Sequence, residues 1–117
     1  MVLDHQKLDV YRHALALLKA CDDIIKQLPK GRAKLKEQLD DAATSVVANT
    51  AEGAGEFSGK EKARFYRMAR RSAIEIASWI DVIASRREAP VPLIERAQRE
   101  LEIVVPMLVK LIQSCER

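Results

Sequence analysis

The apolar side chains recur at three- and four-residue steps along almost the whole chain, and this spacing most constrains its fold. Such positions lie on one face of a helix, so the pattern predicts amphipathic helices. Breaks at residues 29–31, 53–55 and 89–92 divide it into four stretches. Only 4% of the residues are aromatic, so the core must come from Leu, Ile, Val and Ala, which favours helices over an all-β fold.

Capping and turn residues at the ends of the apolar stretches predict where each helix begins and ends. We expect helices at about 4–28, 33–53, 58–87 and 92–115, within a single domain at 1–117. Ser58 and Glu61 match the S-x-x-E capping box at the start of the third helix. Gly53 and Gly55 are expected to end the second helix as terminal glycines. Short turns between amphipathic helices favour an all-α fold, an antiparallel up-down four-helix bundle.

The large apolar side chains predict which face of each helix is buried. In the first helix the expected buried face holds Leu8, Tyr11, Leu15, Leu18, Ile25 and Leu28. In the third helix it holds Phe65, Met68, Ser72, Ile76, Trp79, Ile80 and Ile83.

The compartment is predicted from what the chain carries. No apolar run approaches the roughly 18 residues that span a bilayer, so we expect no membrane partner. The first residues lack the basic start and apolar stretch of a secretory signal. Cys21 and Cys115 stand far apart with no CxxC partner, and two thiols alone make a poor zinc site. A cytoplasmic protein with reduced thiols is the prediction.

Motifs of enzymatic chemistry are not convincing in this sequence. Residues 53–61 have the glycines and lysine of a phosphate loop, but Glu61 stands where a hydroxyl is needed, and the segment follows a helix. His5 and His13 do not have the Glu-x-x-His spacing of di-iron bundles. We therefore expect no catalytic residue, no metal and no cofactor, and predict that the protein is not an enzyme.

Basic residues gather at the start of the third helix. Between residues 57 and 72 there are six basic residues and one acidic residue. At about 100° per residue, four of them fall within a narrow stripe. This basic stripe consists of Lys60, Arg64, Arg67 and Arg71. It could bind the phosphates of RNA or DNA without reading sequence. The alternative is a solvated helix face without a ligand.

Apolar residues on the outward faces predict self-association. Ile74 and Val82 continue the angular position of the basic stripe, and Val47 and Ala51 lie away from the expected buried face of the second helix. Outward apolar residues on a bundle often meet another subunit, so we expect a homo-oligomer. The alternative function is therefore a protein-interaction scaffold with no nucleic-acid role.

Small and polar residues interrupt the apolar pattern in the second helix. Ser45 and the neighbouring alanines would let two helices approach closely. Asn49 and Glu52, three residues apart, share a face. A buried amide or acid needs partners, so we expect both to pair with Ser72 or Glu75 of the third helix.

Residues 45–53 read S-V-V-A-N-T-A-E-G, and this run resembles the S-x-x-x-N-x-A-E-G signature of a bacterial four-helix-bundle family. Members are encoded in intervening sequences of 23S ribosomal RNA genes and are labelled S23 ribosomal proteins. Further matches are Leu8-Asp9-Val10-Tyr11 near the start, and Gly53, Ser72 and Glu75.

The resemblance carries expectations of its own. It implies an up-down bundle that assembles as a ring-like homopentamer. Accessory proteins of diversity-generating retroelements, which are similar in fold, bind a reverse transcriptase and nucleic acid through basic surfaces. Asp40-Asp41 stands where the family commonly has basic residues, which leaves the third helix to supply such a surface here.

Overall fold

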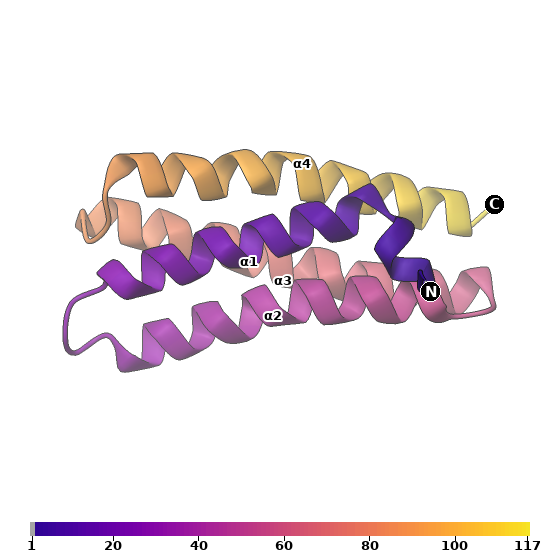
Figure 1. Cartoon of the computed structure of the whole chain (residues 1–117), viewed down its shortest axis with the longest axis horizontal. Coiled ribbons are helices and arrows are strands. Elements are labelled where there is room, and N and C mark those ends of the chain that lie inside the picture. The colour runs from indigo at the N-terminus through magenta and orange to yellow at the C-terminus, as the bar shows by residue number, and fades with distance from the viewer. Residues whose placement is uncertain (1) are drawn as a thin grey trace.

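The computed structural model describes residues 2–117 and contains four long helices in up-down order (Figure 1). A short 3-10 helix, η1, precedes them. The bounds are η1 Asp4–Lys7, α1 Asp9–Gln27, α2 Ala33–Gly55, α3 Gly59–Arg86 and α4 Val91–Cys115. Helices α1 and α3 each pack against both α2 and α4, so the four helices surround one core. The predicted all-α four-helix bundle is confirmed.

The core is built from aliphatic side chains and alanines, as the composition predicts. Tyr66 is an exception, an aromatic side chain that is only 3% exposed. Thr50 is fully buried, and its hydroxyl donates to the carbonyl oxygen of Val46 at 2.7 Å, so the polar group is satisfied. Within residues 2–117, no helix is long and apolar enough to cross a membrane.

The predicted buried faces of the first and third helices are confirmed in part. Ile76, Ile80, Ile83 and Leu28 are buried as predicted, but the other buried residues are not the predicted ones. In α1 the buried residues are Val10, Ala14, Leu17, Ala20, Cys21 and Ile24. In α3 they are Ala63, Tyr66, Ala69, Ala73, Ile76, Ile80 and Ile83. Leu15 and Met68, expected inside, are 41% and 38% exposed. The core faces of both helices therefore mix alanines with large residues such as Leu17 and Ile76, while Leu18 and Ile25 are only partly buried against the core.

The first helix does not run from residue 4, as the sequence suggested. Leu8 has an extended backbone, with φ −86° and ψ 130°, and it separates η1 from α1. Its side chain packs against the core, while η1 turns back onto α2. Figure 1 shows this turn lying across the bundle near the end of α2.

The helix α2 ends at Gly55, the second of the two glycines expected to end it, and not at the expected bound of Gly53. Neither glycine has a positive φ. Gly53 is buried, and a Cβ atom placed on it would lie 2.7 Å from the ring of Tyr66. The missing side chain therefore serves close packing between α2 and α3 and not a left-handed helix cap.

The start of α3 follows the sequence signal. The Ser58 hydroxyl accepts a hydrogen bond from the backbone N–H of Glu61 at 3.1 Å. The reciprocal half of the capping box is absent among residues 2–117, since the Glu61 carboxylate instead accepts from Nε of Arg64 at 2.7 Å. The hydroxyl cap still satisfies one of the free N–H groups at the helix start.

A bidentate ion pair joins the α1–α2 turn to the α3–α4 turn, at the end of the bundle opposite the α2–α3 turn. Arg32, before α2, donates from Nη2 to Glu88 at 2.6 Å and from Nε at 3.0 Å. The hydrogen bonds from Arg32 hold the pKa of the Glu88 carboxyl below its usual range. Between α1 and α4, Arg96 donates to Asp23 at 2.8 Å. These pairs fix the edges of the bundle away from the basic stripe.

The contact between Gly53 and Tyr66 predicts an unusual result for a glycine-to-alanine change. Ala is favoured over Gly inside a helix by up to about 1 kcal/mol, but overpacking a core costs about 1–3 kcal/mol. We expect Gly53→Ala to lower the free energy of unfolding by about 1–2 kcal/mol in urea denaturation. The matched control is Gly55→Ala in the same helix, where a Cβ atom meets nothing within 4 Å. That variant is expected to be neutral or slightly stabilised, and equal behaviour of the two variants would contradict the packing role of Gly53.

Candidate nucleic-acid interface

The basic stripe lies on the solvent side of α3. Its four members, Lys60, Arg64, Arg67 and Arg71, are all exposed. They recur at steps of four, three and four residues on a continuous helix, so their side chains leave from one face. The four residues of the predicted stripe are therefore all exposed to solvent in the described chain.

The members of the stripe differ in how far acidic groups offset their charge. Arg64 pairs with Glu61 at 2.7 Å, and Arg67 pairs with Glu116 of the C-terminal end at 3.3 Å. Lys60 and Arg71 form no ion pair with any residue from 2 to 117. Exposed ion pairs are weak, on the order of 0–1 kcal/mol, so phosphates can compete for all four cations.

Lys62 belongs to the same basic segment but has a structural task. Its ammonium group donates to the carbonyl oxygens of Ala54 at 2.9 Å and Gly53 at 3.3 Å. These carbonyls belong to the last turn of α2, where backbone acceptors lack helical partners. Lys62 thus caps α2 from α3. In the sequence, Lys62 is noticeable only as one of the basic residues of this segment. Its position shortly after Gly53 and Gly55 is the feature that could have indicated a cap.

A chain of hydrogen bonds links α2 to α3 through the polar residues of the 45–53 segment. The side-chain amide of Asn49 donates to the Ser45 carbonyl oxygen at 3.0 Å and to Ser45 Oγ at 2.9 Å. The hydroxyl of Ser72 donates to Ser45 Oγ at 2.8 Å across the helix pair. Asn49 therefore reaches Ser72 through Ser45, and the half-buried polar groups are satisfied.

Glu52 does not join this chain, contrary to the prediction. It is exposed on α2 and makes no side-chain hydrogen bond with residues 2–117. Glu52 follows Ser45 by seven residues and so leaves α2 on a similar side, but it lies nearer the end of the helix and its side chain is exposed. Glu75 on α3 is also exposed, and its Oε2 accepts from the indole N–H of Trp79 at 3.1 Å. No carboxylate pair forms between the two helices within the described residues.

The polar chain forms one wall of a groove between α2 and α3. The groove has a volume of about 300 Å³ and is mainly polar. Its lining consists of Ser45 and Asn49 from α2 and Met68, Arg71, Ser72 and Glu75 from α3. Arg71 is at once a member of the basic stripe and a wall of this groove. The structure thus brings the signature residues and one end of the stripe together, which their sequence separation does not predict.

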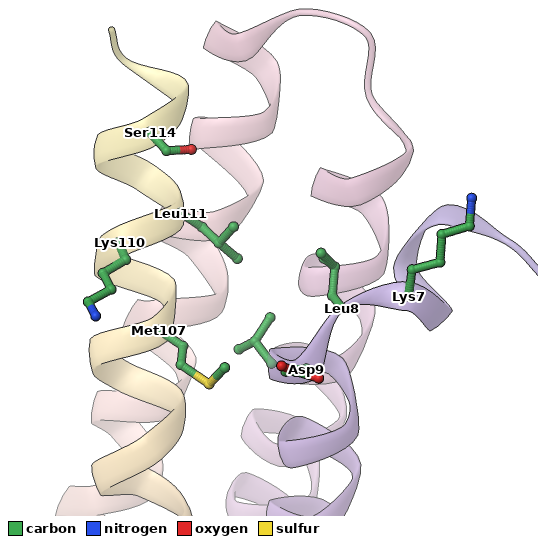
Figure 2. A pocket seen from close by; sticks show the side chains of 8 residues that line it. Lys7, Leu8, Asp9, Met107, Lys110, Leu111 and Ser114 are labelled. Carbon is green, nitrogen blue, oxygen red and sulfur yellow. The ribbon is translucent and has the colours of Figure 1, made fainter.

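A second hollow lies between the start of α1 and the later part of α4. It measures about 470 Å³ and is mostly apolar, with Leu8, Met107 and Leu111 among its lining. Figure 2 shows the side chains of Lys7 and Lys110 extending away from it on opposite sides. Asp9 and Ser114 also line it, but most of its lining is apolar, whereas the lining of the groove at Arg71 is mainly polar. The groove at Arg71 is therefore the better candidate.

The residues expected at subunit contacts occupy different environments. Ile74 is 47% exposed on α3. Val82 and Ala51 are half-buried. Val47 is also half-buried and packs against the core of its own chain, which accounts for its apolar character without a partner. Ile74 is thus the predicted contact residue with the most surface left to cover.

The described part of the chain contains no cluster of metal ligands, and its buried cysteine is not a reactive thiol. Among residues 2–117, no group of three or more His, Cys, Asp or Glu side chains could hold a metal ion. His13 contacts Glu100 at 2.9 Å in a pair between α1 and α4. Both cysteines are free, and burial raises the pKa of the Cys21 thiol to about 12. A thiol held neutral in this way is a poor nucleophile.

Comparison with known proteins gives one match. A family model described as 23S rRNA-intervening sequence protein matches residues 6–110 of the chain. This is the family whose signature residues 45–53 resemble. No curated protein matches the chain.

The contrast between Asn49 and Glu52 can be measured as stability. Asn49→Asp removes the amide donor and sets a carboxylate beside the Ser45 carbonyl oxygen. We expect it to lower the free energy of unfolding by about 1–2 kcal/mol at neutral pH, since a hydrogen bond is replaced by repulsion. The control, Glu52→Gln, is expected to stay within about 0.5 kcal/mol of the wild type because Glu52 is exposed and unpartnered. Equal losses in both variants would contradict the polar chain described above.

Proposed function

The chain belongs to the 23S rRNA-intervening sequence protein family, and on that premise we propose that it binds nucleic acid or a nucleoprotein. In this proposal the protein is not an enzyme, and it acts as a homo-oligomeric helical bundle. The binding surface is the basic stripe of α3, formed by Lys60, Arg64, Arg67 and Arg71. These side chains contact phosphates and do not read bases.

One observation carries the proposal, namely the exposure of four cations on a single helix face. The stripe spans three turns of α3, and its central arginines have only weak acidic partners at the surface. A row of exposed cations along a rigid helix is the electrostatic footprint expected for a phosphate backbone. Lys60 and Arg71, without ion pairs among residues 2–117, are the members most available to phosphates.

The proposal predicts binding that weakens with salt and depends on the stripe. A variant with all four stripe residues changed to Ala is titrated with generic RNA and DNA by fluorescence anisotropy across a salt series. We expect weaker binding at low salt and a log–log salt slope smaller in magnitude by roughly three on a single strand, because each neutralised phosphate contributes about 0.7.

The control removes the same charge elsewhere on the surface. It carries four exposed basic residues changed to Ala, namely Arg12, Lys26, Arg99 and Lys110. It is expected to keep most of the wild-type slope. If the wild type binds neither RNA nor DNA at low salt, or if the two quadruple variants behave alike, the stripe is not the binding surface.

Self-association would extend this surface by repeating the stripe around an assembly. The resemblance to the family supports a homopentamer, and the exposed Ile74 supports a contact on the outer face of α3. A protein-interaction scaffold without a nucleic-acid role is the second candidate, and the same apolar residue favours it. The two candidates share the oligomer and differ in the salt series.

A single charge at Ile74 tests the contact. Ile74→Glu is expected to shift the mass measured by light scattering toward the monomer, because a buried unpaired carboxylate is costly at an interface. Leu15→Glu changes a residue on α1 with similar exposure, 41% against 47%, and is expected to leave the assembly intact. A monomeric wild type would refute the oligomer, and dissociation by Leu15→Glu alone would move the contact to α1.

The cytoplasm is the compartment in which we place the protein. A nucleic-acid partner and two free cysteines are both consistent with a reducing interior.

A further inference from the structure

The hydrogen-bond donors and acceptors that remain without partners in the groove between α2 and α3 determine which kind of ligand it can bind. Asn49 donates from Nδ2 to a backbone carbonyl oxygen, which can only accept, so the orientation of its amide is fixed. Its Oδ1 consequently faces the other way and receives no hydrogen bond from residues 2–117. Asn49 thus presents an acceptor at the groove wall.

The remaining walls of the groove add acceptors on one side and a cation on the other. The Ser72 proton is committed to Ser45, which leaves lone pairs at Ser72 Oγ. The Glu75 carboxylate has one oxygen bound to Trp79 and the other free. Arg71 supplies the one guanidinium in the lining, and it has no ion pair within residues 2–117. A matching ligand must therefore bring several N–H donors and a nearby anion.

The charge around the groove decides between a cationic ligand and a neutral one. Ammonium and guanidinium groups also carry N–H donors. The basic stripe, however, reaches the rim of the groove at Arg71 and would repel such cations. A neutral base with a phosphate attached meets both requirements. Met68, 38% exposed and lining the groove, offers an apolar contact for a flat ring.

Among the common bases, guanine fits this pattern best. Its Watson–Crick edge places two N–H donors side by side, and a carboxylate can accept both with its two oxygens. Adenine and cytosine place an acceptor nitrogen beside the amino group, which Glu75 would repel. Uracil and thymine have one N–H between two carbonyl oxygens.

We propose that this groove holds one unstacked guanine base of a single-stranded nucleic acid. Glu75 and Asn49 accept from the base, Arg71 binds its phosphate, and the adjacent phosphates follow the basic stripe. This inference rests on the proposed nucleic-acid function and adds base preference to it. Base edges are free for such contacts in single strands and loops, whereas in a duplex this edge is already paired.

The test compares short labelled RNA probes by fluorescence anisotropy at one low salt concentration. Each probe is a uridine tract with a single central guanosine, inosine, adenosine or uridine. We expect the guanosine probe to bind about tenfold more tightly than the uridine probe, in line with the discrimination of a good bidentate pair. Inosine, which lacks the exocyclic amino group, is expected to lose most of that gain.

Two matched variants assign the preference to the groove. Glu75→Gln keeps an acceptor for Trp79 but loses the charge and half of the accepting capacity, so we expect it to bind all four probes alike. Glu52→Gln removes the same charge outside the groove and is expected to retain the preference.

The outcomes separate this inference from the proposal beneath it. Equal binding of all four probes by the wild type overturns the guanine site and leaves the phosphate stripe standing. A guanosine preference that survives Glu75→Gln also overturns it. Absence of binding to every RNA probe overturns the guanine site, and it overturns the proposed function as well if the corresponding DNA probes are not bound either. The inosine probe needs no variant, so the result does not depend on whether Glu75→Gln folds.

Discussion

The close approach of α2 and α3 at Gly53 is the constraint on which the other features depend. The absence of a side chain at Gly53 leaves room for the Tyr66 ring, which would lie 2.7 Å from a Cβ atom there. This contact fixes the register of the two antiparallel helices. With that register, Lys62 reaches the last carbonyls of α2, and Ser72 lies opposite Ser45. Residues 53–61, which have the glycines and lysine of a phosphate loop, thus serve the packing of α2 against α3.

The same register determines which cations remain for a partner. Lys62 is turned inward to cap α2, whereas the neighbouring stripe residues stay outside. Arg71, at the end of the stripe, is left beside the polar chain that starts at Asn49. A phosphate surface and a small polar groove consequently meet at one residue. For binding a nucleic acid, the polar groove between α2 and α3 and the exposed cations beside it are better suited than the apolar hollow near Leu8.

Much of the fold was predictable from the sequence, because helix periodicity and turn residues are local signals. The four helices, the Ser58 cap and the family resemblance are confirmed. The errors have tertiary causes. Buried faces were assigned by side-chain size, yet α1 and α3 point alanines at the core, which only the helix spacing reveals. Gly53 looked like a stop because its contact with Tyr66 is not visible in sequence. Glu52 was expected to pair beside Asn49, but its side chain is exposed and makes no side-chain hydrogen bond with residues 2–117.

The central claim is that a nucleic acid binds along the boundary between α2 and α3, in the groove lined by Asn49 and Arg71 and on the adjacent basic stripe. Side-chain and backbone NMR signals of the ¹⁵N-labelled protein, followed while a short single-stranded RNA is added, test it most directly. The account predicts that the Asn49 side-chain amide and the backbone amides of residues 60–75 shift together, with α1 and the early part of α4 largely unchanged. Shifts confined to α1 and α4, or stripe signals that move while the Asn49 amide stays in place, would contradict it.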